Sequence, residues 1–441
     1  MALPVIAYDR FLMGFSLAVH IILAAIGIAL PLIIIGCELV GLKKHDDYYI
    51  RLAKRLTIML IVFFAVGTAS GTLVALNLLL LWPKFMVLVS KVAILPIYIE
   101  VFAFFTEAIF LGIYVYSWDK FKNRYMHVVV GALVALGAVL SAVFITMLNA
   151  FMNTPAGFDI SAYISKGVIT GVNPLAVFFT PSTLIEVAHV ISTSYFAGGF
   201  IFVLYFAYMM LKSSGEERMH YRKGMNIVFT IVLIAVIFSV LTGILSILNT
   251  YRFQPEKYAA FELNLYPTTN AAELIGGFYS GGKVIDAISI PNLQSILANG
   301  SASTPVPGLS SFPMDTWPPL IIHTLFDTMV FLGFGFGLFL LIILILILLK
   351  RHPFDNRIVL KLLILAGIIA VILLEMGWVA AEVGRQPWIV YNVMLVSQAA
   401  NTSQSVIPIA IAIIFVYAII LPVTLLVIRR LLRDRPLIGG D

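Results

Sequence analysis

The sequence predicts an all-α polytopic membrane protein with nine transmembrane helices. Of its 441 residues, 61% are hydrophobic and only 11% are charged, whereas about a quarter of the residues in soluble domains carry charge. Nine apolar segments are each long enough to cross a bilayer. Lysine and arginine gather in alternate connections between these segments, which is the pattern expected of a protein with many spans.

The first apolar segment is a retained helix rather than a cleaved signal. It has the length of a full span, contains His20, and follows an N-terminus that lacks a basic region. Each later segment is a predominantly apolar run long enough to cross the bilayer. The predicted spans are residues 11–37, 55–81, 92–117, 125–150, 182–211, 224–249, 317–349, 358–383 and 405–429.

The distribution of basic residues predicts the orientation of the chain. The connections after the first, third, fifth and seventh spans and the C-terminal tail hold, with their flanking residues, 20 of the 28 Lys and Arg residues. The N-terminus is therefore expected outside and the C-terminus in the cytoplasm. Residues 1–249 carry spans one to six, residues 250–316 form a long outer loop, and residues 317–441 carry the last three spans and a cytoplasmic tail.

Composition also excludes several classes of protein. The net charge of +6 comes from basic residues in short loops, so it indicates topology and not a nucleic-acid partner. The single Cys37 allows neither an internal disulfide nor a cysteine-ligated cluster. The absence of an obvious internal repeat argues against an inverted-repeat transporter.

We single out three residues inside the spans as candidate ligands of haem iron. His20 lies in the first span, His189 in the fifth and Met329 in the seventh, all in the outer half of the predicted membrane. Each alone is also explained as a buried hydrogen-bonding or space-filling residue. A histidine and a methionine at matching depth can together hold one low-spin haem.

Glu100 and Glu107 lie seven residues apart on one face of the third span. Carboxylates at membrane depth are expensive to keep, so these two predict a proton relay or a cofactor contact. Ser141 and Asn149 on the fourth span either extend this polar track or join helices by hydrogen bonds.

The stretch from Glu375 to Trp388 ends the eighth span with an unusual set of polar side chains. Glu375, Trp378 and Glu382 share one helical face because of their i, i+3, i+7 spacing. One interpretation is a helix end with interfacial tryptophans and an ion pair between Glu382 and Arg385. The other is a face that carries ligands.

In the long outer loop, Lys257 and Glu262 are the charged residues of interest. A solvated charge pair is one interpretation. A site that oxidises quinol needs the same two groups, one to polarise an oxygen and one to accept a proton.

Taken together, these positions resemble subunit I of the cytochrome bd family of quinol:oxygen oxidoreductases, over nearly the whole chain. The strongest element is the Gly-Trp…Glu-x-Gly-Arg-Gln-Pro-Trp run at 377–388, and Lys257 to Glu262 fits a Lys-x-Ala-Ala-x-Glu pattern. Two departures indicate a distant branch. Glu100 and Glu107 are seven residues apart where the family has eight, and Asp327 stands where an arginine is frequent.

The resemblance implies three haems and their ligands. His189 and Met329 would hold a low-spin haem b. His20 and Glu382 would each ligate one of two high-spin haems, a haem b and either a haem d or a further haem b. The remaining roles are Trp378 beside the high-spin haems, Arg385 as a propionate or electrostatic partner, Glu107 with Glu100 on a proton path, and Lys257 with Glu262 at the quinol.

The implied activity is that of a terminal respiratory oxidase in the plasma membrane of a prokaryote. It would oxidise quinol at the outer face and reduce oxygen to water with cytoplasmic protons. The expected partners are a second large membrane subunit, a small single-helix subunit, quinol, oxygen and the lipid bilayer, and no nucleic acid. The alternatives are a haem-b electron-transfer paralogue without oxygen reduction and a proton-coupled transporter. The matched His189 and Met329 argue against the transporter.

Overall fold

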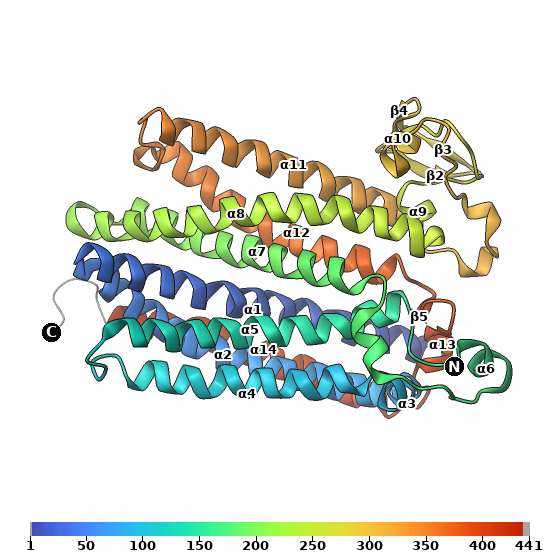
Figure 1. The fold of residues 1–441 in the computed structure, drawn as a ribbon, viewed down its shortest axis with the longest axis horizontal. Coiled ribbons are helices and arrows are strands. Elements are labelled where there is room, and N and C mark those ends of the chain that lie inside the picture. The colour runs from blue at the N-terminus through green and yellow to red at the C-terminus, as the bar shows by residue number, and fades with distance from the viewer. Residues whose placement is uncertain (1, 435–441) are drawn as a thin grey trace.

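The computed structural model describes residues 2–434, and within them nine helices are long and apolar enough to cross a membrane. They lie side by side along one axis (Figure 1). The nine are α1 (Ala2–Lys44), α2 (Asp47–Leu81), α4 (Ile94–Tyr116), α5 (Arg124–Asn153), α7 (Thr183–Lys212), α8 (Gly215–Phe253), α11 (Ile321–Leu348), α12 (Arg357–Val383) and α14 (Val406–Asp434). The predicted spans are confirmed, and most helices continue past their apolar part by one or two polar turns.

Two buried clusters hold the bundle together. The larger runs along α1, α2, α7, α8 and α12, and the smaller gathers at one end of the bundle. Close approach of α1 and α7 depends on Gly198, because a Cβ there would lie only 2.2 Å from the backbone oxygen of Ala25. The resulting contact brings α12, which packs on α7, toward α1.

The two ends of the bundle differ in structure. At the end where α1 begins, the connections form short helices and small antiparallel hairpins (Figure 1). They comprise α3 (Pro83–Val92), α6 (Ile160–Lys166), η1 (Pro174–Phe179), α9 (Pro255–Phe261), α10 (Leu293–Asn299), η2 (Leu309–Ser311), η3 (Met314–Thr316), α13 (Val396–Ala399) and the hairpins β1 (Glu273–Ile275) with β4 (Ile288–Ile290), β2 (Phe278–Ser280) with β3 (Lys283–Ile285), and β5 (Trp388–Val390) with β6 (Met394–Leu395).

At the other end the connections are short, with one 3-10 turn, η4 (Pro353–Asp355). Side chains that follow the turns cap the next helix. Asp46, Asn123 and Asn356 each accept a hydrogen bond from a backbone N–H in the first turn of α2, α5 and α12. α1 begins and α14 ends at opposite ends of the bundle, as an odd number of spans requires (Figure 1). We follow the charge-based prediction and name the hairpin-rich end outer; that assignment and the three-part division of the chain remain predictions.

Candidate functional site

His189 of α7 and Met329 of α11 lie on the sides of these helices that approach each other. Both helices run in the same direction. Seven residues further along, Phe196 and Phe336 are in edge contact at 5.3 Å between ring centroids, and Phe200 also contacts Phe336 at 5.1 Å. Seven residues are two helical turns, so His189 and Met329 lie on those same faces, about 10 Å above the aromatic contact. The predicted matching depth of the two side chains is therefore present.

Hydrogen bonds select the ring nitrogen of His189 that is free to bind a metal. Its Nδ1 lies 3.0 Å from the hydroxyl oxygen of Thr242, and that hydroxyl donates its own hydrogen to the backbone oxygen of Phe238 at 2.7 Å. Thr242 can therefore only accept from Nδ1, which must carry the ring hydrogen. This leaves Nε2 with its lone pair, the form in which histidine ligates iron.

His20 has the same arrangement on α1. Its Nδ1 lies 2.9 Å from the hydroxyl oxygen of Ser70, whose hydrogen goes to the backbone oxygen of Gly67 at 2.8 Å. The Nε2 atom of His20 is thus also left with its lone pair. Both histidines are half-buried, and each is oriented by one hydroxyl from a neighbouring helix.

Glycines stand beside all three of these side chains. A Cβ at Gly71 would lie 3.1 Å from the ring of His20, one at Gly243 would lie 3.6 Å from His189, and one at Gly377 would lie 3.4 Å from the sulfur of Met329. Each ring or thioether is thus flanked by a position that carries no side chain. A flat cofactor needs such space next to its axial ligands.

Glu382 lies in a network that joins α12 to α5 and α7. Asn149 donates to one oxygen of Glu382 at 2.7 Å, and Arg385 forms an ion pair with the other. Arg385 also donates to Asn153 at 2.8 Å, and Asn153 donates to Glu186 at 2.8 Å. The Glu382–Arg385 pair predicted from the spacing is therefore present, within a larger group of polar side chains.

The start of the chain also reaches this network. Arg10 on α1 donates to the side-chain oxygen of Gln386 at 3.0 Å, and Gln386 follows Arg385 directly. The first and the eighth membrane helices are thus joined next to the polar network.

Lys257 of α9 belongs to the same network and not to the surface of the outer loop. Its ammonium group is buried and donates to the backbone oxygen of Ala381 at 2.9 Å. Burial lowers the pKa of Lys257 to about 8, repulsion from Arg385 acts in the same direction, and attraction by Glu186 and Glu382 opposes both. The solvated pair with Glu262 is therefore not what the fold contains.

Glu262 points to a second cluster, formed with Glu273, Asp327 and His323. Burial raises the pKa of Glu262 well above its usual value, and its hydrogen-bonded neighbour Glu273 raises it further. Asp327 accepts from the backbone N–H of Gly276 at 2.6 Å and lies 3.6 Å from His323. Glu262 is therefore easier to protonate than a solvated carboxyl, and it is hydrogen-bonded to Glu273.

Of the two carboxylates of α4, which faces α5, Glu107 is buried and Glu100 is half-buried. Ser141 donates to Glu100 at 2.6 Å. Glu107 packs so tightly on Gly137 that a Cβ there would lie 2.7 Å from its backbone nitrogen. Ser141 and Asn149 were the two polar residues expected either to extend this track or to join helices. Ser141 extends it by its hydrogen bond to Glu100, whereas Asn149 donates a hydrogen bond to Glu382.

Two buried polar atoms near the network have no hydrogen-bond partner among residues 2–434: Oε1 of Glu375 and Nε of Arg385. Trp378 lies on the same face of α12 as Glu375 and Glu382. Within the described chain, no three His, Cys, Asp or Glu side chains are grouped closely enough to chelate a bare metal ion. A haem iron needs only one or two protein ligands, and propionates need donors such as Nε of Arg385, so the residues fit haems.

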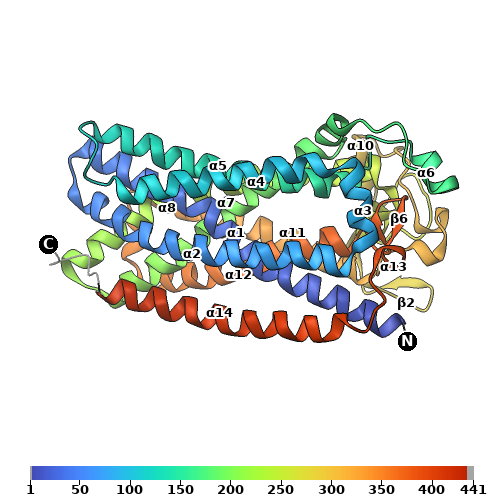
Figure 2. The ribbon, with the colours of Figure 1, turned by 90° about the horizontal axis from the view of Figure 1, so that it is seen from below.

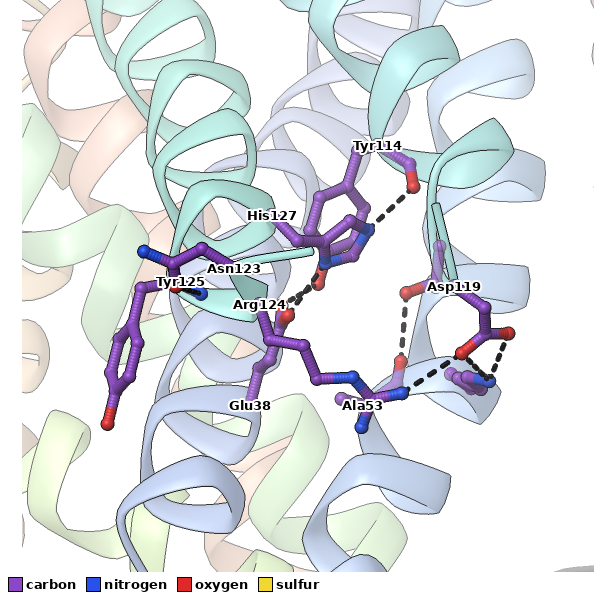
Figure 3. A network of polar contacts seen from close by, with 10 residues as sticks. Glu38, Ala53, Tyr114, Asp119, Asn123, Arg124, Tyr125 and His127 are labelled. Carbon is purple, nitrogen blue, oxygen red and sulfur yellow. Dashed lines mark hydrogen bonds and ion pairs between the residues drawn. The ribbon is translucent and has the colours of Figure 1, made fainter. Parts of the chain in front are cut away.

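Sequence reasoning missed a second polar network at the inner end of the bundle (Figure 3). The Glu38 carboxylate lies 2.6 Å from Nδ1 of His127 and accepts from the Tyr114 hydroxyl at 2.7 Å, and Nε2 of His127 lies 2.9 Å from the Tyr114 backbone oxygen. All three side chains are buried. Glu186 was missed as well, although its place three residues before His189, on the same helical face, was a usable signal.

Comparison with known proteins gives a consistent set of similarities. The family model of cytochrome bd terminal oxidase subunit I matches residues 8–436. A provisionally named cytochrome bd menaquinol oxidase subunit I of Bacillus subtilis (strain 168) is 39% identical over 433 residues, 97% of this chain and 96% of that protein. A cytochrome bd ubiquinol oxidase subunit 1 of the same organism is 26% identical over 397 residues, 87% of this chain and 83% of that one. The structure of bd oxidase from Geobacillus thermodenitrificans superposes with a TM-score of 0.89 at 37% identity, covering 98% of this chain and 99% of that chain.

Proposed function

The chain belongs to the cytochrome bd terminal oxidase subunit I family, and from this premise we propose that it is the haem-carrying subunit of a terminal respiratory oxidase. The observation that supports this most is that His189 and Met329 lie at one depth on approaching sides of α7 and α11, while Nε2 of His189 keeps its lone pair. A transporter has no use for two matched iron ligands.

The proposed ligands follow from the donor atoms described above. His189 and Met329 would hold a low-spin haem b. His20 and Glu382 would each ligate one high-spin haem, of which one is a haem b and the other a haem d or a further haem b. Bound haems would supply one-electron transfer and an open iron position for oxygen. Arg385 would pair with a propionate, and Trp378 would pack beside the high-spin haems.

The chain's own charges favour movement of an electron toward Glu382. Adding an electron at this site adds negative charge in a medium of low dielectric constant. The positive charges of the buried Lys257 and Arg385 would offset that negative charge. In the absence of the added electron, the carboxylates of Glu186 and Glu382 compensate the two positive charges. Lys257 thus acts in this proposal through its charge at the end of α12.

Quinol would bind at the Glu262 cluster. A cavity of about 490 Å³ lies between the β1–β4 hairpin and α11, with Asp327 and Gly276 on its polar side and Ile275 and Phe331 among its apolar walls. Burial raises the pKa of Glu273, which is hydrogen-bonded to Glu262, so the Glu273 carboxylate is the group proposed to accept a proton from a quinol hydroxyl. Released protons would leave on the outer side.

Protons for oxygen reduction would come from the cytoplasm past Glu107 and Glu100. These two carboxylates lie on one face of α4, and the Ser141 hydroxyl holds Glu100 in position. The relatives come from Bacillus and Geobacillus, which supports a prokaryotic plasma membrane as the location. The proposed partners are a second large membrane subunit and a small single-helix subunit.

The test uses the complex purified with its partner subunits. His189→Ala and Met329→Leu should each abolish the low-spin band of the dithionite-reduced spectrum and stop quinol-driven oxygen consumption, whereas Met314→Leu, at an exposed outer turn, should change neither. A wild-type spectrum without haem bands would disprove the proposal. A low-spin band without any carbon monoxide-binding haem would instead identify an electron-transfer paralogue.

A further inference from the structure

We propose that the groove between α3 and the segment around α6 binds the headgroup of an anionic phospholipid. The groove is a cavity of about 450 Å³ at the outer end of the bundle, and none of the residues assigned above lines it. Lys84, Lys91 and Val87 of α3 form one side, and Tyr163, Gly167 and Val168 form the other.

The sequence of α3 explains why it lies at the membrane surface. Phe85, Val89 and Val92 are buried on one side, and Lys84 and Lys91 are exposed on the other. A helix with one apolar and one basic side lies in the interface between lipid and water. α3 accordingly crosses the end of the bundle between α2 and α4, instead of continuing along its axis (Figure 2).

The two lysines form a cationic site without a counterion. They are seven residues apart, so they point the same way about 10 Å from each other. Neither has a hydrogen bond or an ion pair with any other residue in the described part of the chain, and no carboxylate lines the cavity. The acidic residue of the facing segment, Asp159, is engaged in capping α6 at 2.9 Å from the Ala162 nitrogen, while Lys166 adds a third cation beside Gly167.

The remaining walls match the rest of a phospholipid. Val87 and Val168 are 54% and 49% exposed, an unfavourable state unless apolar groups cover them. A phosphate bound by the lysines would bring its glycerol and the first acyl methylenes against these two valines. Free phosphate has the same charge but would leave the valines exposed to water, so the combination of cations and apolar surface favours the lipid.

An occupied groove would also support the Glu382 network from outside. The buried side of α3 packs on β5 and α13, which follow Arg385 in the chain. Asn401, just after α13, donates from its backbone and side chain to the oxygens of Leu81 and Leu80 at 2.8 and 2.9 Å, where α2 joins α3. Lipid binding should therefore stabilise the segment that carries Arg385.

The experiment compares the delipidated complex after addition of phosphatidylglycerol, phosphatidylcholine or sodium phosphate, with thermal unfolding and lipid retention by native mass spectrometry as readouts. Phosphatidylglycerol alone should raise the unfolding temperature of the wild type. Replacing both lysines, Lys84→Gln with Lys91→Gln, should weaken its retention by about 30-fold, since each basic residue near an anionic lipid is worth about one kcal/mol.

Two controls make the result decisive. Lys84→Arg with Lys91→Arg should retain the lipid, and Lys283→Gln, which removes a charge from an exposed strand at the same end, should behave as wild type. Equal stabilisation of the double Gln variant by phosphatidylglycerol would overturn the proposal. So would full stabilisation by phosphatidylcholine, which lacks a net negative charge, or by sodium phosphate alone, which lacks the apolar part.

Discussion

The polar networks at the two ends of the bundle are built from similar groups and differ in how completely those groups are paired. At the inner end, both oxygens of Glu38 and both ring nitrogens of His127 have partners. At the outer end, the Glu382 network leaves Nε of Arg385 and one oxygen of Glu375 buried without a partner in the described chain.

This difference separates a structural network from a site prepared for another group. Buried polar atoms in folded proteins are nearly always hydrogen-bonded, because an unpaired one costs about 1–3 kcal/mol. The inner network meets that requirement by itself and joins α1, α4 and α5. The outer network meets it only if something else binds, which agrees with the proposal that haems bind there.

The largest effect should come from the outer network. Glu382→Ala should lower quinol-driven oxygen consumption by about 100-fold or more, because losing even a supporting residue of a metal site costs roughly 10- to 100-fold. The carbon monoxide difference spectrum should lose one high-spin haem. Unchanged carbon monoxide binding would remove Glu382 from the set of ligands.

The inner network should show the opposite pattern. His127→Ala should lower the free energy of unfolding by about 3–5 kcal/mol, because the buried Glu38 carboxylate then keeps only the Tyr114 hydroxyl as a partner. Denaturant titration of the detergent-solubilised complex measures this loss, and the haem spectrum of the folded fraction should be that of the wild type. The double variant Glu38→Gln with His127→Gln should be less damaging than His127→Ala. If His127→Ala changed the haem spectrum and left the free energy of unfolding unchanged, the inner network would not be a purely structural one.

A smaller effect should follow the charge of Lys257. Its pKa is about 8 in the folded protein, below its usual value of 10.5, so the ammonium loses its proton as pH rises through about 8. Turnover that depends on this charge should fall with pH in that range, and Lys257→Gln should show no such inflection. Between about pH 8 and 10.5 the unfolded chain binds more protons at this residue, so stability should rise with pH relative to the variant.

The smallest effect belongs to the surface beside the inner network. Asp119 forms ion pairs with Lys54 and Arg124, each at 3.0 Å, but its side chain is 64% exposed (Figure 3). Its hydrogen bond with Lys54 lowers the pKa of Asp119, so the pairing is present at neutral pH and lost in acid. Asp119→Asn should change stability by less than about 1 kcal/mol, and a loss as large as that of His127→Ala would place Asp119 within the inner network.

Features along one helix were predictable from the sequence, and features between distant segments were not. Span number, the shared face of Glu100 and Glu107, and the Glu382–Arg385 pair all follow from helical periodicity. The partners of His127 or Asn153 lie tens to hundreds of residues away, and no periodicity relates them.

That Lys257 and Glu262 lie in different surroundings could have been predicted from the sequence. Five residues on a helix correspond to about 140° of rotation, so two side chains at that spacing point to different surroundings. α3 was harder to predict, because ten residues between two spans give too short a pattern to distinguish from a loop.

The bond between Arg10 and Gln386 bears on how the protein is made. These residues are 376 positions apart. Seven spans are therefore synthesised before the eighth span, which ends next to Gln386, can contact the first. A nascent chain that has reached the end of α11 already contains His20, His189 and Met329, and it lacks Glu382 and Arg385. The proposed ligands of the low-spin haem are therefore synthesised before the eighth span, and the proposed ligand Glu382 follows them.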